Sequence, residues 1–115
     1  YWRRHPNLEN TVKIYARPVA EAKECILDYR TVAEKDGLSW LEIRPLTGRK
    51  HQIRAQLAFV GKALVGDVKY GREPATQERE IALFARSLTV LHPTLRTPVQ
   101  IVATPPKRYP WDVFL

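Results

Sequence analysis

The densest chemistry of the chain lies in one short run of basic and polar residues, Thr47-Gly48-Arg49-Lys50-His51-Gln52-Ile53-Arg54. Arginine, lysine and histidine at such close spacing bind anions, and arginine keeps its charge even when it is partly buried. Arg54 stands among apolar residues, so it needs a carboxylate or phosphate partner. A solvated basic helix end is the alternative interpretation of the same run.

Other kinds of site find no support in the residues. The single cysteine, Cys25, excludes an internal disulfide and a Cys-rich zinc site. His5, His51 and His92 are too scattered for a metal centre, and His51 is better explained as a hydrogen-bonding partner. No phosphate-cradling glycine loop and no nucleophile elbow is present. The sequence therefore predicts no metal and no cofactor.

A helix is expected to position the basic run. Thr47 is placed to cap it, residues 48–50 would form its first turn, and it would run to about Val60 and end before Gly61. The apolar residues of this helix form two faces that would be buried: Ile53, Leu57 and Val60 on one, Ala55 and Phe59 on the other. Basic residues at a helix start oppose the helix dipole, so an anion from elsewhere would stabilise them.

Strands are expected both before and after this helix in the sequence. Residues 24–33 alternate in polarity, residues 38–44 resume an extended pattern, and Asp36-Gly37 between them predicts a hairpin turn. Residues 81–91 and 98–103 are further strand candidates, whereas residues 1–18 and 105–115 are expected to be irregular. The predicted fold class is α+β, with a mostly antiparallel or mixed sheet and one main helix in a single domain over residues 1–115.

Charge indicates the class of partner. Nineteen Lys and Arg against twelve Asp and Glu give the 115 residues a net charge of +7 and a pI near 9.9. Such a balance favours a polyanion, with nucleic acid first. No apolar run approaches the roughly 20 residues of a membrane span, and no secretory signal is present. We therefore expect a cytoplasmic protein without a membrane partner. Since the sequence holds no methionine, we interpret it as a fragment or a processed piece.

Several motifs together resemble a known family. The segment from Arg44 to Arg54 is followed by Leu57-Ala58, by Leu64-Val65-Gly66-Asp67 and by Tyr70-Gly71. This succession closely resembles the C-terminal half of the RluA-type RNA pseudouridine synthases, whose pattern is approximately TGR-x-HQIR-x-x-L, a glycine, then LVGD-x-x-YG. The resemblance covers residues 24–106 and implies a partial pseudouridine synthase catalytic domain.

The resemblance implies an activity and a role for one residue. These enzymes isomerise uridine to pseudouridine within ribosomal or transfer RNA, without a metal or organic cofactor, and they flip the target base out of the RNA. The nucleophile is an aspartate on an upstream Arg-Leu-Asp segment, and the arginine of HQIR orients it. Arg54 matches that arginine, so the expected anion would be the nucleophile. No Arg-Leu-Asp occurs in this chain, so the fragment alone is expected to be inactive, and Asp67 is expected to be structural.

The remaining expectations concern partners. The RNA surface would use basic and polar residues on and around the helix: Arg49, Lys50, His51, Gln52, Lys62, Lys69 and Arg72. Trp2 would either stack on a base or pack within the fold. Exposed strand edges would allow copies of the chain to associate. The alternatives to an enzyme are a non-catalytic RNA-binding module descended from the same fold, and a basic domain that holds a protein partner.

Overall fold

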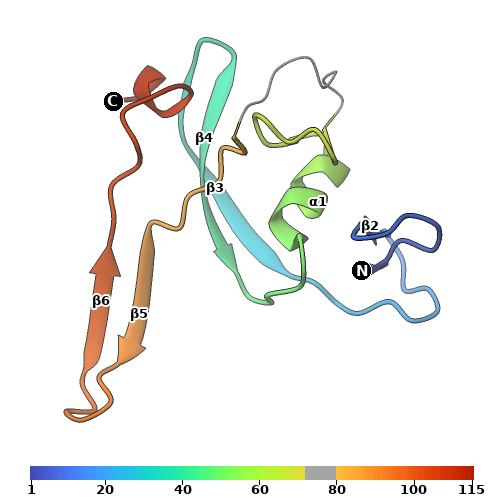
Figure 1. Ribbon diagram of the computed structural model, residues 1–115, viewed down its shortest axis with the longest axis horizontal. Coiled ribbons are helices and arrows are strands. Elements are labelled where there is room, and N and C mark those ends of the chain that lie inside the picture. The colour runs from blue at the N-terminus through green and yellow to red at the C-terminus, as the bar shows by residue number, and fades with distance from the viewer. Residues whose placement is uncertain (72–79) are drawn as a thin grey trace.

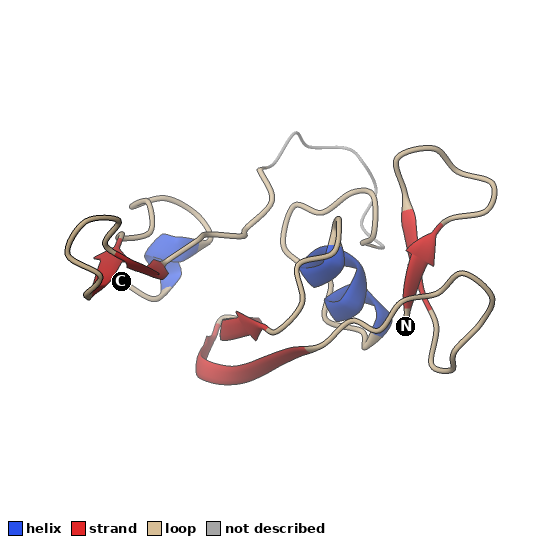
Figure 2. Cartoon of the chain, turned by 90° about the horizontal axis from the view of Figure 1, so that it is seen from below, coloured by secondary structure: helices blue, strands red, loops and turns tan. Residues whose placement is uncertain are grey.

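The computed structural model describes residues 1–71 and 80–115, which form three antiparallel two-stranded sheets and one α-helix. The elements follow in chain order: β1 (Trp2–Arg4), β2 (Val12–Ile14), β3 (Leu27–Lys35), β4 (Leu38–Pro45), α1 (Gln52–Phe59), β5 (Ser87–Leu91), β6 (Pro98–Val102) and a 3-10 helix, η1 (Trp111–Val113). Helix α1 lies between the β1–β2 hairpin and the β3–β4 hairpin, and the β5–β6 hairpin lies at the far side of the molecule (Figures 1 and 2). The α+β prediction is confirmed. Within the described ranges, no helix is long and apolar enough to cross a membrane.

The β3–β4 hairpin forms where the sequence predicted it. Asp36 and Gly37 connect the strands with φ angles of 53° and 74°, and Lys35 pairs with Leu38. Two consecutive positive φ angles are the geometry of a type I′ turn, which Asp-Gly favours. The alternation in residues 24–33 predicts one buried face of this strand. That face is only partly buried, because Tyr29 is 44% exposed.

The residues before α1 do not form its first turn, so the predicted helix start was wrong. The helix begins at Gln52, and its N-cap residue His51 has a left-handed φ of 54° without a side-chain capping bond. Thr47 instead donates its hydroxyl to the side chain of Gln52 at 2.7 Å. The basic residues therefore lie in a turn that leads into the helix.

The end of α1 agrees with the prediction. Gly61 has a φ of 80°, its N–H donates to the Ala58 carbonyl, and Lys62 N–H donates to the Leu57 carbonyl. These two bonds are a Schellman motif, which requires a left-handed residue that glycine adopts without strain. The two predicted apolar faces are only partly right: Ala55 and Leu57 are buried, whereas Phe59 and Val60 are more than half exposed.

The N-terminal residues are not irregular, which corrects the prediction for residues 1–18. Trp2 and Val12 come from paired strands and form the buried apolar cluster with Cys25 and Ala55. The Trp2 indole N–H also donates to the Lys50 carbonyl at 2.8 Å. With 9% of its surface exposed, Trp2 packs within the fold and is not available to stack on a base.

The C-terminal half is the more open part of the molecule. Residues 81–86 are not a strand, whereas β5 and β6 fall inside the predicted ranges. The tail carries η1, whose Trp111 packs edge-on against Trp40 and Phe84. Apolar side chains of β5 and β6 remain exposed, among them Leu88, Leu91 and Ile101.

Candidate functional site

The core of the candidate site is a two-point ion pair between α1 and the loop that follows it. Arg54 Nε donates to Asp67 Oδ2 and Arg54 Nη2 donates to Asp67 Oδ1, both at 3.0 Å. The Asp67 side chain is fully buried and the Arg54 side chain keeps 19% of its exposure. Such a fork fixes the plane of the guanidinium as well as its position. Among the described residues, none makes a hydrogen bond with Arg54 Nη1.

Asp67 also organises its own loop. Its Oδ1 accepts the backbone N–H of Tyr70 at 3.2 Å, and its carbonyl accepts the N–H of Gly71 at 2.9 Å. A Cβ at Gly71 would lie 2.2 Å from the Asp67 carbonyl oxygen, so only glycine allows this close approach. The spacing of Asp67, Tyr70 and Gly71 is therefore that of a single tight turn built on one carboxylate. This geometry agrees with the interpretation of Asp67 as structural.

Tyr70 closes the site from the side of the N-terminal hairpin. The Arg54 guanidinium carbon lies 5.0 Å from the centre of the Tyr70 ring. The Tyr70 hydroxyl accepts the backbone N–H of Val12 at 3.1 Å and lies 2.8 Å from His51 Nδ1. The rings of His51 and Tyr70 meet edge to face, with centroids 5.6 Å apart. Residues from β2, the helix N-cap and the loop after α1 thus converge on one phenol.

Burial and neighbouring charges shift the pKa values of Asp67, Arg54 and His51. Burial raises the pKa of Asp67, but the bonds from Arg54 and from the Tyr70 N–H outweigh it, so this pKa lies below its usual 3.8. The bond to Asp67 raises the pKa of Arg54. Burial, together with the positive charges of Arg54, Lys69 and Lys50, lowers the pKa of His51 below 6.5, although Asp67 opposes the shift. At neutral pH the pair is therefore ionised and His51 is uncharged.

The observed partner of Arg54 changes one expectation. Arg54 was expected to need an anion, and the family resemblance implied that this anion is a nucleophile from outside the chain. Asp67 supplies an anion from within the chain, so an external carboxylate is not needed to neutralise Arg54. Any further anion would have to bind the Nη1 side of the same guanidinium, where no residue of the described part of the chain makes a hydrogen bond.

Gln52 is buried at the start of α1 and holds the preceding turn closed. Its Oε1 accepts from the Thr47 hydroxyl and from the Arg49 N–H at 3.0 Å, and its Nε2 donates to the Ile26 carbonyl at 3.2 Å. Only 3% of its surface is exposed. The amide of Gln52 is therefore committed to the fold and is not free to make the RNA contact that the sequence had predicted.

The other predicted RNA-binding residues are placed as follows. Lys50 and Lys69 are exposed beside the β1–β2 loop, where Lys69 Nζ donates to the Asn10 carbonyl at 2.6 Å. The charges of both lysines and of Arg54 act on His51. Arg49 is half-buried and donates its Nε to the Glu24 carbonyl at 3.3 Å. Lys62 is exposed just past the opposite end of α1. Arg72 lies outside the described residues.

Tyr70 is the site residue to which the sequence argument assigned no role. The available signal was its position three residues after Asp67, the spacing at which a carboxylate accepts a turn N–H. Its contacts with Val12 and His51 depend on tertiary structure, so no local pattern could have revealed them.

Comparison with known proteins points to one family. Residues 4–59 match the family model for RNA pseudouridylate synthase. The chain is 42% identical over 65 residues to RNA pseudouridine synthase 3, mitochondrial, of rice (Oryza sativa subsp. japonica), a match that covers 55% of this chain and 14% of the relative.

Two further relatives support the assignment. RNA pseudouridine synthase 4, mitochondrial, of Arabidopsis thaliana is 47% identical over 55 residues, covering 46% of this chain and 12% of the relative. The dual-specificity RNA pseudouridine synthase RluA of Yersinia pestis is 29% identical over 79 residues, covering 67% of this chain and 38% of the relative. The chain thus spans less than half the length of these relatives. Together with the site motif, the matches show that the chain belongs to the RluA-type family of RNA pseudouridine synthases.

Proposed function

We propose that the protein to which this chain belongs isomerises uridine to pseudouridine in RNA, and that Arg54 orients the nucleophilic aspartate. The supporting observation is the two-point pair with Asp67, which fixes the guanidinium through Nε and Nη2 and leaves Nη1 for a second carboxylate. A guanidinium held in one plane can position a carboxylate without reorganising during the reaction.

The nucleophile is proposed to lie outside these 115 residues, since no Arg-Leu-Asp occurs among them. The four aspartates are Asp28, Asp36, Asp67 and Asp112. Asp67 is fully buried in its pair with Arg54, which makes it unavailable to a nucleotide. We therefore expect the chain alone to be inactive.

The direct test compares the chain with a form of the protein extended upstream through an Arg-Leu-Asp segment. Bulk RNA is incubated with each, and pseudouridine is measured by mass spectrometry after nuclease digestion. We expect conversion only with the extended protein, and its loss when the aspartate of Arg-Leu-Asp is replaced by asparagine. Salt-sensitive RNA binding by an extended protein without conversion would instead support the non-catalytic RNA-binding module.

The proposed RNA surface consists of Lys50, Lys69, Arg49 and His51, with Lys62 at its far end. The positive charges of Lys50 and Lys69 act on the same imidazole, that of His51, so they form a common electropositive region beside Arg54. Each phosphate contact that is lost should reduce the slope of log affinity against log salt by about 0.7–0.9. Lys50→Ala and Lys69→Ala are expected to show this change, and Lys35→Ala, at the β3–β4 turn, is the control. If the slope of log affinity against log salt is unchanged in both Lys50→Ala and Lys69→Ala, the RNA does not bind at this surface.

Self-association of the chain is proposed for the exposed β5–β6 hairpin. An isolated two-stranded hairpin is marginally stable, and Leu88, Leu91 and Ile101 are exposed on this one. Light scattering over a range of concentrations tests the proposal: mass should rise with concentration, and Ile101→Lys should suppress the rise. A constant monomer mass would refute it.

The cytoplasmic location remains a proposal as well. The rice and Arabidopsis relatives are named as mitochondrial proteins, so the compartment needs its own measurement. Fractionation of cells that express the tagged protein is expected to recover it in the cytoplasmic fraction, and recovery in organelles would overturn the proposal.

A further inference from the structure

We propose that Tyr70 is a positioning residue that fixes the orientation of Arg54: its ring covers the guanidinium while its hydroxyl is anchored to β2 and to His51. The inference rests on the proposed function, in which Arg54 must present its Nη1 side to a second carboxylate. It concerns a residue that neither the ion pair nor the RNA surface includes.

Asp67 alone leaves Arg54 one degree of freedom. A bidentate pair fixes the two groups in a common plane, but the pair as a whole can tilt about the line that joins them. The Tyr70 ring lies 5.0 Å from the Arg54 guanidinium carbon and restricts this tilt. Cation–π attraction is worth more where both groups are partly withdrawn from water, as they are here.

The Tyr70 ring is itself held at both ends. Its backbone N–H donates to Asp67 Oδ1 at 3.2 Å, and its hydroxyl accepts the Val12 N–H at 3.1 Å. Asp67 thereby holds both the guanidinium and the residue that covers it. The Val12 bond connects this arrangement to the β1–β2 hairpin, which the apolar cluster ties to α1.

The hydroxyl proton of Tyr70 also has an acceptor within the site. The Tyr70 oxygen already accepts from Val12, and uncharged His51 can accept at Nδ1, so we assign the Tyr70 O–H as donor to His51 Nδ1 at 2.8 Å. The Tyr70 hydroxyl then donates its proton to His51 and accepts the Val12 N–H on one lone pair. These two bonds set the ring in a single orientation.

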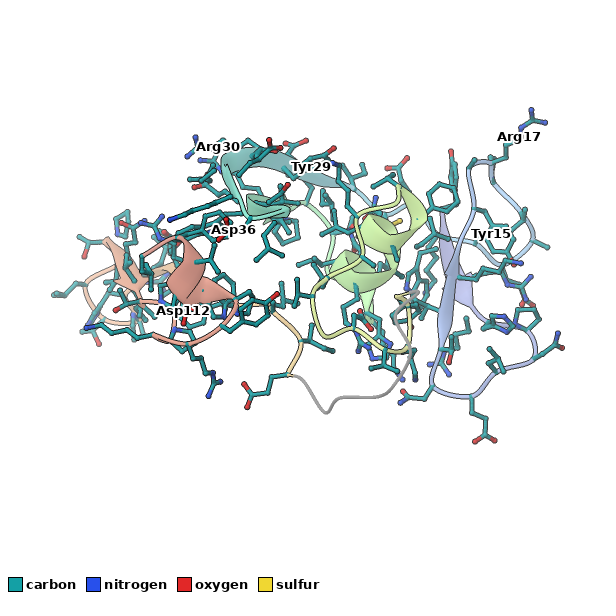
Figure 3. All side chains as sticks on the ribbon, turned by 90° about the horizontal axis from the view of Figure 1, so that it is seen from above. Tyr15, Arg17, Tyr29, Arg30, Asp36 and Asp112 are labelled. Atoms are coloured by element: carbon teal, nitrogen blue, oxygen red, sulfur yellow. The ribbon has the colours of Figure 1, made fainter. Side chains whose placement is uncertain are left out.

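The test uses two variants and one control, and it has a readout that does not depend on activity. Tyr70→Leu removes ring and hydroxyl, Tyr70→Phe removes the hydroxyl alone, and Tyr29→Phe removes an exposed phenol from β3 (Figure 3). Hydrogen exchange of the Arg54 Nε–H is followed by nitrogen-15 NMR in the 115-residue chain, and turnover is measured in the extended protein.

We expect Tyr70→Leu to speed Nε–H exchange and to lower kcat by about tenfold or more, with the KM for RNA within about twofold, because a misplaced group costs rate and not binding. Tyr70→Phe should show a smaller effect of the same kind, and Tyr29→Phe none. Should Tyr70→Leu fail to fold, the near-isosteric Tyr70→Phe decides alone.

Unchanged exchange and unchanged kcat in folded Tyr70→Phe and Tyr70→Leu would overturn the proposal. A faster exchange in a protein without any pseudouridine formation would uphold the positioning of Arg54 and count against the proposed function instead. An equal rise in KM and loss of RNA affinity, with kcat unchanged, would make Tyr70 an RNA contact and also overturn the positioning role.

Discussion

Two arginine–carboxylate pairs of the same form occur in different surroundings. In the β3–β4 hairpin, Arg30 Nε and Nη2 donate to the two oxygens of Glu42, both at 3.2 Å, across a directly opposed strand pair. Between α1 and its following loop, Arg54 and Asp67 make the same fork at 3.0 Å. The hairpin pair is open to water, with side chains 68% and 30% exposed, whereas the Asp67 side chain is fully buried.

The comparison teaches that geometry alone does not assign a role. Water and salt screen an exposed pair, so the Arg30–Glu42 fork adds little to folding. A buried carboxylate without its partner is costly, so the Arg54–Asp67 fork holds two segments together and fixes the side chain of Arg54. An aromatic ring, that of Tyr70, packs against the buried pair, and His51 meets this ring edge to face.

The largest expected effect is the loss of the buried pair. Asp67→Asn keeps the shape of the side chain but leaves Arg54 without a counter-charge, so we expect the free energy of unfolding to fall by about 2–4 kcal/mol, somewhat less than for a fully buried pair because Arg54 remains 19% exposed. Urea denaturation measures it. A change of less than about 0.5 kcal/mol would mean that the fork contributes no more than a surface pair.

The next largest effect is expected at the turn that Asp67 builds. In Gly71→Ala the added Cβ would meet the Asp67 carbonyl oxygen at 2.2 Å, so the backbone must move and stability should fall by about 1–3 kcal/mol. Gly48→Ala is the matched control, because nothing lies within 4 Å of its Cβ and its φ is not positive. Equal stability of the two variants would show that the turn is not held closed.

A pH dependence should distinguish the two regions further. The pKa of His51 is lower in the folded protein than its ordinary 6.5, so the unfolded chain binds more protons as pH falls through 6.5 toward the folded value. The contribution of His51 to the free energy of unfolding is therefore fully present above pH 6.5 and decreases as the pH falls below it. The pKa of Asp67 is also lower in the folded protein, so its contribution to stability is likewise lost as the pH falls, but only below the ordinary pKa of 3.8. Urea midpoints measured between pH 8 and 5 should fall in the parent and change less in His51→Gln; parallel curves would contradict the assignment.

The smallest expected effect is in the hairpin pair. Glu42→Gln removes the charge opposite Arg30 in the same conservative way as Asp67→Asn does opposite Arg54. Because this pair is exposed and screened, the urea midpoint should stay within error of the parent, and added salt should not change it. A loss comparable to that of Asp67→Asn would remove the distinction between the two pairs.

The hairpin and the end of α1 could be predicted because their signals are local. Asp36-Gly37 adopts the two positive φ angles that its residue types favour, and Gly61 ends the helix in the same way. The β1–β2 hairpin was missed because strands of three residues are too short to show a period. The hairpin is held by the apolar cluster that Trp2 and Val12 form with Cys25 and Ala55 and by the bond from Trp2 to the Lys50 carbonyl, which no local pattern encodes.

The predicted start of the helix was wrong because the side chain of Gln52 competes for the groups that would cap it. Thr47 has the right type and position for an N-cap, but the Gln52 side chain binds both the Thr47 hydroxyl and the Arg49 N–H, and closes a different turn. The motif therefore named residues that lie near one another, Arg49 to Arg54, although their conformation differs from the predicted helical turn. The partner of Arg54 depended on where the loop after α1 returns, which spacing alone does not fix.

The most direct test of the central claim is the rate of pseudouridine formation by the extended protein with Arg54→Lys, compared with Arg30→Lys. Lysine keeps the charge opposite each carboxylate but loses the fork and the Nη1 donors. We expect kcat to fall about 100-fold or more for Arg54→Lys, with RNA affinity retained, and to stay at the parental value for Arg30→Lys. Parental turnover in a folded Arg54→Lys protein would contradict it.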